Sequence, residues 1–133
     1  MATQVTAPGE VLTFEANGDL SANIYNVVYQ TTTERRVALL TAAASRDAGP
    51  LGILQDKPSV AGRSASVKVA GLCIARAGAA VTIGRVLTFD ASGSVIHQSS
   101  AGEWAIGVAL TTAAAVGDQI SMLWRGPVLA NSF

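Results

Sequence analysis

Few residues in this sequence are suited to acid–base or nucleophilic chemistry. His97 is the only histidine, and with Asp90 and a nearby serine it could form a Ser-His-Asp set. A serine nucleophile on a sharp turn usually carries the pattern Gly-x-Ser-x-Gly. The nearest approach, at 62–66, reads Gly-Arg-Ser-Ala-Ser and lacks the final glycine. We therefore interpret His97, which ends an expected strand, as a surface residue.

The remaining reactive groups do not form a recognisable cofactor or metal site. Cys73 is the only cysteine and lies within the apolar run 72–75, so we expect a buried, unreactive thiol. A structural zinc site needs about four Cys, His or carboxylate ligands at characteristic spacing. The lysines are only Lys57 and Lys68, and no phosphate-binding glycine loop is present. The sequence predicts no enzyme activity, no cofactor and no metal.

Charge and hydropathy argue against nucleic acid and membrane as direct partners. Nine basic residues balance nine acidic ones, whereas binding through phosphates needs clustered cations. The only adjacent basic pair, Arg35-Arg36, follows Glu34. Tyr25 and Tyr29 precede that pair, but packing explains them better than base stacking. The uncharged stretch 104–117 is too short and too interrupted by glycine and threonine to span a bilayer.

The elements that must position these residues are expected to be short strands. Glycine, proline and Asn-Gly signals recur closely along the chain, with β-branched runs between them. The alanine-rich segments 42–48 and 111–116 could form short helical turns. We predict an all-β fold, a small compact β-barrel or sandwich. The expected strands are 24–33, 37–41, 66–70, 85–89, 94–97 and 119–125.

An internal repeat is the most informative feature of the sequence. Segment 52–75 aligns without gaps on segment 107–130 at an offset of 55 residues, which matches three glycines in each copy. Glycine permits positive φ or close backbone approach, so matched glycines indicate two related strand-loop-strand units. We expect these two units to pair about a pseudo-twofold axis within one domain.

The two ends of the chain and its apolar composition suggest how it meets partners. Residues 1–23 are polar and weakly periodic, and we expect an extended N-terminal arm that a neighbour orders; residues 24–133 form the β-rich domain. Half of the residues are hydrophobic and only 14% are charged. We therefore expect apolar surface to be buried against other chains. The candidate interface residues are aromatic or apolar: Ile24, Tyr25, Val27, Tyr29, Trp104 and Trp124.

The second half of the chain resembles the capsid decoration proteins of tailed bacteriophages, which are also called cement or head-stabilising proteins. The resemblance rests on Gly-Val-Ala-Leu at 107–110, the alanine-rich turn 111–118 and the strand and Arg-Gly pair at 120–126. An upstream strand at 81–87 also matches, and the likeness covers about residues 37–130.

This resemblance implies a β-rich virion protein without catalysis. It further implies a homotrimer at threefold or quasi-threefold sites on the outer capsid surface, where the major capsid protein is the partner. Such a protein would stabilise the shell against the pressure of packaged DNA. The alternatives are a head-fibre, tail or baseplate module that recognises a host surface, and a small barrel enzyme.

Overall fold

The computed structural model describes residues 10–40, 49–99 and 103–130, and all regular secondary structure within them is β-strand. This confirms the predicted all-β class. The segment 111–116, which could have been helical, is a loop in which Ala113 pairs with Val81. The segment 42–48 lies outside the described residues. The strands are β1 (Glu10–Ala16), β2 (Val27–Gln30), β3 (Arg36–Leu39), β4 (Gly52–Leu54), β5 (Ser64–Arg76), β6 (Val86–Phe89), β7 (Val95–His97), β8 (Glu103–Ala109) and β9 (Gln119–Ala130).

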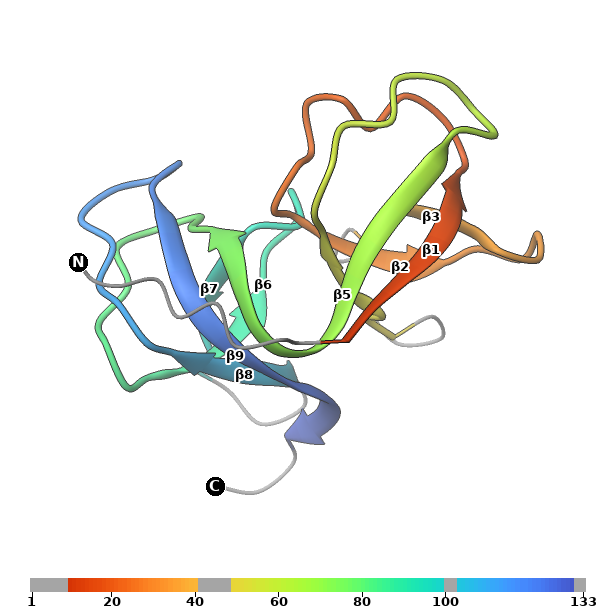
Figure 1. The fold of residues 1–133 in the computed structure, drawn as a ribbon. Coiled ribbons are helices and arrows are strands. Elements are labelled where there is room, and N and C mark those ends of the chain that lie inside the picture. Colours follow the sequence, from red (N-terminus) through yellow and green to blue (C-terminus); the bar gives the residue numbers. More distant parts are fainter. Residues whose placement is uncertain (1–9, 41–48, 100–102, 131–133) are drawn as a thin grey trace.

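The strands form one hydrogen-bonded sheet in the order β1-β3-β2-β4-β5-β9-β8-β6-β7. An additional pairing of β1 with β5 closes a ring of five strands in the first half of the chain. In the second half, a parallel bridge between Ala77 and Val95 connects the end of β5 to β7. Figure 1 shows the result: two groups of strands lie side by side, and the long strand β5 runs through both.

The segment expected to be an N-terminal arm contributes a strand of the chain's own sheet. Residues 11–15 pair antiparallel with β5, and Ala16 pairs with Val37 of β3. Ala16 and Leu20 are buried in the core. The expectation of an arm is therefore wrong for residues 10–23, because pairing with a distant strand compensates for weak local periodicity. Residues 1–9 lie outside the described part of the chain.

The repeat extends over the whole described chain. Ile53 pairs with Lys68 and Leu54 with Val67, and 55 residues later Val108 pairs with Leu123 and Ala109 with Met122. The preceding strands repeat with slightly larger offsets. Val28 pairs with Gly52 as Leu87 pairs with Gly107, and Leu12 pairs with Val67 as Cys73 pairs with Met122. We call residues 10–70 the first unit and residues 71–130 the second unit.

Strand β5 is shared between the two units. Its 64–70 part is the last strand of the first unit, and its 71–76 part is the first strand of the second. The change occurs at Gly71, whose φ of 87° favours glycine.

The interior of each unit uses the same positions. The first unit buries seven small or aliphatic residues: Ala16, Leu20, Val28, Val37, Leu54, Ala65 and Val67. Their equivalents in the second unit are all buried as well: Ala77, Val81, Leu87, Val95, Ala109, Ile120 and Met122. The second cluster also contains Val27, Leu40 and Ile53 of the first unit. The two units are therefore joined by a common core.

Candidate interaction surface

The residues with catalytic potential are occupied in turns and in the core, and they are not brought together. Asp90 accepts hydrogen bonds from the backbone N–H groups of Ser92 and Ser94, at 2.9 and 3.0 Å, and so holds the β6–β7 turn. The Nε2 atom of His97 accepts a hydrogen bond of 2.9 Å from the backbone N–H of Thr82. Each group supports a loop of the second unit.

Cys73 is buried in the common core, as expected from the sequence. Burial raises the pKa of its thiol to about 12, and nearby Lys68 opposes this only in part. The thiolate is the reactive form of cysteine, so this residue is an apolar packing group. Among the residues that the structure describes, no three His, Cys, Asp or Glu side chains gather as a metal site would require.

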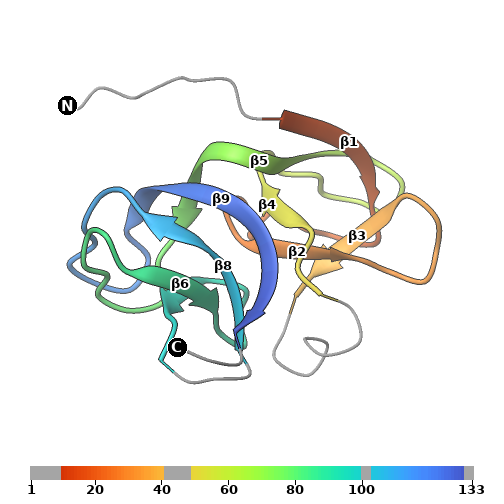
Figure 2. The same cartoon turned by 90° about the horizontal axis from the view of Figure 1, so that it is seen from below.

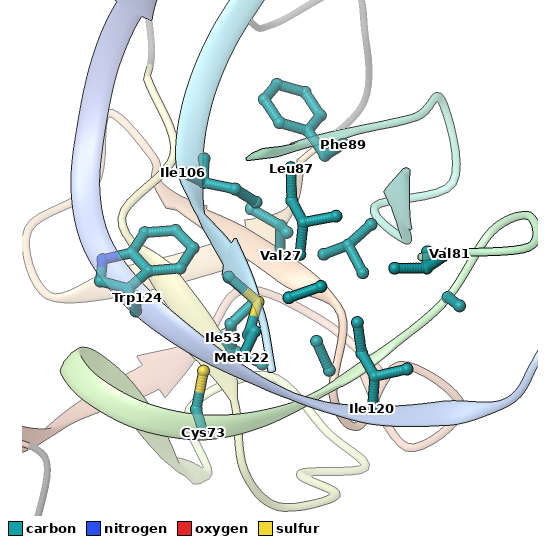
Figure 3. Packing of buried hydrophobic residues seen from close by; sticks show 14 of the residues in the cluster. Val27, Ile53, Cys73, Val81, Leu87, Phe89, Ile106, Ile120, Met122 and Trp124 are labelled. Carbon is teal, nitrogen blue, oxygen red and sulfur yellow. The ribbon is translucent and has the colours of Figure 1, made fainter. Parts of the chain in front are cut away.

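The six predicted interface residues lie in two different environments. Val27 and Trp124 are fully buried within the chain, so they have no surface to offer to a partner. Figure 3 shows both in the common core, near Ile53 and Ile106. Tyr25, Tyr29 and Trp104 are half-buried and pack against the same core, and Ile24 is also half-buried.

The exposed apolar surface lies elsewhere, on residues that the sequence analysis did not select. Leu12 and Val11 are exposed on β1, at 43% and 46%. The others lie in loops: Val60, Ile83, Leu110 and Val116. Ile83 and Leu110 flank a hydrogen bond from the Gly84 N–H to the Ala109 carbonyl oxygen, which brings two loops of the second unit together.

A gapped search for the repeat could have drawn attention to β1. At an offset of 61 residues, 11–16 (Val-Leu-Thr-Phe-Glu-Ala) matches 72–77 (Leu-Cys-Ile-Ala-Arg-Ala). The offset differs from 55 because the loops of the two units differ in length, so a comparison at the single offset of 55 could not find it.

In the part of the chain that the structure describes, one ion pair joins Arg36 Nε to Glu15 Oε1 at 3.4 Å, and both side chains are partly exposed. Such pairs contribute little stability. No helix among the described residues is long and apolar enough to cross a membrane.

These features define a class of protein: an all-β protein whose polar residues hold turns and whose exposed apolar residues are available for contact with other proteins. The comparisons then identify the family. Residues 7–124 match the family model of phage cement proteins. The chain therefore belongs to this family and is a structural protein of a phage virion, associated with the capsid.

The fold is also similar to a solved virion structure. The N base of the head fibre protein gp8.5 of bacteriophage phi29 superimposes with a TM-score of 0.65 and 12% identity. The alignment covers 90% of this chain and 97% of that one. No curated protein matches the chain in sequence.

Proposed function

We propose that this protein binds the outer surface of a phage capsid as an oligomer, a trimer at threefold or quasi-threefold sites, and stabilises the shell against internal DNA pressure. The observation that carries the proposal is the family match over residues 7–124. The structure adds support, since Asp90, His97 and Cys73 all have structural roles. The partners are the major capsid protein and further copies of the chain.

The proposed action is thermodynamic. A protein that binds the intact shell and not its separated subunits stabilises the shell by mass action. An oligomer that bridges neighbouring capsid subunits gains avidity, because each additional contact is effectively intramolecular. No reacting group is needed for this function.

The test is to mix purified protein with bare expanded capsids and to measure co-sedimentation and the temperature at which DNA-filled heads release DNA. We expect saturable binding and a higher release temperature. A protein that remains in the supernatant at all concentrations would contradict the proposal.

A second candidate is the base of a head fibre, which is favoured by the fold similarity to the phi29 head fibre N base. A receptor-recognising fibre module would sediment with host cells as well as with capsids. Cells and capsids tested in parallel therefore separate the two functions.

Of the segment expected to be an arm, residues 10–16 form β1 of the chain's own sheet, so we propose that residues 1–9 contact the capsid. Deleting 1–9 leaves β1 in place and tests whether a terminal segment reaches the capsid. We expect weaker co-sedimentation and unchanged thermal unfolding.

A further inference from the structure

The two units of the chain meet through a contact that uses different surfaces on each side. On the first unit, Val27 and Ile53 project out of β2 and β4, and we call these two residues the plug. On the second unit, Cys73, Ile106 and Trp124 line the inner face of β5, β8 and β9, and we call them the socket. All five residues are buried in one core cluster, and Figure 3 shows them together. In Figure 2, β2 and β4 face β8 and β9.

Hydrogen bonds reinforce the contact between the units. The Val27 N–H donates to the Gly93 carbonyl oxygen at 2.8 Å, and the Asn26 side-chain amide donates to the same oxygen at 3.2 Å. The Arg76 N–H donates to the Tyr25 carbonyl oxygen at 2.9 Å. The segment that leads into β2 is therefore fixed against the second unit.

The expected pseudo-twofold pairing is wrong, because the contact is not reciprocal. A twofold axis would require the Glu15 N–H, the equivalent of Arg76, to bond to Gly84, the equivalent of Tyr25. The Glu15 N–H instead donates to the Arg35 carbonyl oxygen of its own unit at 2.7 Å. A contact between two different surfaces is heterologous, and it leaves one unused copy of each surface.

The unused socket belongs to the first unit. Its residues are the repeat equivalents of Cys73, Ile106 and Trp124, namely Leu12, Leu51 and Val69. Leu12 is 43% exposed, whereas Cys73 is 6% exposed. Leu51 and Val69 are half-buried, whereas their equivalents are buried. All three positions are thus more open where no other unit covers them.

The unused plug belongs to the second unit. The equivalents of Val27 and Ile53 are Val86 and Val108, which are half-buried although Val27 and Ile53 are fully buried. Ile83, the equivalent of half-buried Ile24, is 58% exposed beside them. The chain therefore presents an apolar socket on one unit and a matching apolar plug on the other.

We infer that the plug of the second unit (Val86, Val108, with Ile83) inserts into the socket of the first unit (Leu12, Leu51, Val69) of another copy of this chain. The occupant is a second copy because the chain already contains this contact between equivalent surfaces. The inference deepens the proposed function, on which it rests, by assigning the residues that join the copies. A heterologous contact builds rings when the rotation closes.

The C-terminal part of β9 does not fill the position that β1 of a second copy would occupy. In the first unit, the strand continues from Ala70 along β9 of the second unit. In the second unit, β9 instead continues along β8, where Val128 pairs with Ala105 and Ala130 with Glu103. The strand therefore leaves the path that β1 of the next copy would follow.

The polar residues around the contact within the chain differ from those around the proposed contact between copies. Asn26 is replaced by Arg85, and Gly93 and Ser94 are replaced by Arg35 and Arg36. Of these arginines, Arg36 already pairs with Glu15. Arg85 of one copy would approach Arg35 and Arg36 of the other, and these like charges oppose the contact. We therefore expect the contact between copies to rest on its apolar residues and to be weaker than the contact within the chain.

The test uses one charge substitution on each surface, Leu12→Glu in the socket and Val86→Glu in the plug, followed by analytical ultracentrifugation of the full chain. We expect the wild type to associate as its concentration rises. Each variant alone is expected to raise the dissociation constant at least about 30-fold, as for a central apolar anchor. An equal mixture should form a heterodimer and nothing larger, because it contains one intact socket and one intact plug.

Val60→Glu and Val116→Glu are matched controls on other exposed valines. Val60 corresponds to Ala115 of the second unit, whose socket is filled, and Val116 corresponds to Ala61 of the first unit, whose plug is inserted. Both alanines are nevertheless exposed, so these positions lie outside the contact. Both controls should therefore associate as the wild type does. Circular dichroism checks folding, and Leu12→Ser replaces Leu12→Glu if the latter does not fold.

A wild type that stays monomeric at millimolar concentration, or variants that associate normally, would overturn the inference. So would a Leu12→Glu variant that associates normally but no longer sediments with capsids, since the socket would then bind the capsid protein. A monomer that binds capsids refutes this contact and the oligomeric part of the proposed function but leaves capsid binding intact, whereas an oligomer that ignores capsids refutes capsid binding and leaves the contact intact.

Discussion

Two residues of the first unit adopt a backbone conformation for which the second unit uses glycine. Tyr25 and Arg35 have φ of 70° and 64°, and their repeat equivalents Gly84 and Gly93 have φ of 88° and 75°. Left-handed backbone costs a non-glycine residue about 1–2 kcal/mol. The half-buried Tyr25 packs against the common core, whereas the exposed Arg35 has no such compensation.

We expect Arg35→Gly to leave the free energy of unfolding unchanged or to raise it by up to about 1 kcal/mol, because relief of left-handed strain slightly exceeds the entropic cost of glycine. The reverse change, Gly93→Ala, should destabilise by more than about 1 kcal/mol. Its Cβ would lie 2.5 Å from Leu39 Cδ1 and 3.2 Å from the Val27 carbonyl oxygen. Urea denaturation measures the free energy of unfolding of both variants. A large decrease in this free energy for Arg35→Gly would contradict the role of left-handed strain.

The Cys73 thiol should make stability depend on alkaline pH. Burial raises its pKa to about 12 in the native state, while the unfolded chain titrates near the ordinary thiol value of about 8.5. Between these values the unfolded state has lost the proton and the native state keeps it, so stability falls as pH rises from about 8.5 towards 12. Below about 8.5 the contribution is fully present.

The measurement is the free energy of unfolding against pH for wild type and Cys73→Ala, which lacks this titration. We expect the difference between the two to shrink above pH 8.5. Native wild type should also resist iodoacetamide at pH 8 and react in urea. Rapid alkylation of the native protein would show that the thiol is accessible.

The role of a single residue was predictable where the neighbouring sequence alone determines its environment. An apolar neighbourhood was enough to predict that Cys73 is buried. The interface role expected of Val27 and Trp124 failed because an apolar or aromatic side chain suits a core and an interface equally, and the sequence does not show which surfaces the two units use against each other.

At the scale of elements, strands with a nearby partner were easier to predict than strands with a distant one. The two strands of the β6–β7 hairpin were expected at 85–89 and 94–97, whereas β1 was expected to be part of an arm. Its main partner, β5, lies about 55 residues further along the chain, and the adjacent apolar pair Val11-Leu12 obscures the alternation of a half-buried strand. The 111–116 loop shows tertiary pairing prevailing over alanine's helix propensity.

The paired strands β4–β5 and β8–β9 require glycine at one equivalent position. A Cβ on Gly52 would clash with the Lys68 carbonyl oxygen, and one on Gly107 would clash with the Leu123 carbonyl oxygen. We expect Gly52→Ala and Gly107→Ala each to cost at least about 2 kcal/mol, because backbone must move to admit the methyl group.

Gly18→Ala is the matched control for this pair, since nothing lies within 4 Å of its added Cβ. It should change the free energy of unfolding by less than about 0.5 kcal/mol. Thermal denaturation of the three variants provides the comparison. Equal midpoints for all three would show that the close approach of the strands is not what selects glycine.

At the scale of the whole molecule, the sequence revealed the part of the repeat in which both copies have the same spacing. The β4–β5 and β8–β9 segments share one offset, so an ungapped comparison found them. The earlier strands shift by larger amounts as loop lengths change. The relation between the units was predicted wrongly, because a repeat in sequence carries no information about whether its copies meet through the same surface or through different ones.

The shared strand and common core should make the two units unfold as one. Ile53 of the first unit is buried in the same cluster as Trp124 of the second, and β5 forms part of both units. Loss of either unit would expose the core of the other. We therefore expect a single cooperative transition, as in a small two-state domain.

The chain provides its own probes for this prediction. Trp104 and Trp124 are the only tryptophans and both belong to the second unit, so their fluorescence follows that unit, while far-UV circular dichroism follows all strands. The two signals should give the same midpoint in urea. Ile53→Ala, at the contact, and Leu54→Ala, inside the first unit, should each cost about 2–5 kcal/mol and lower both midpoints together. If dichroism changed before fluorescence, the first unit would be unfolding alone, and the two cores would be energetically separate.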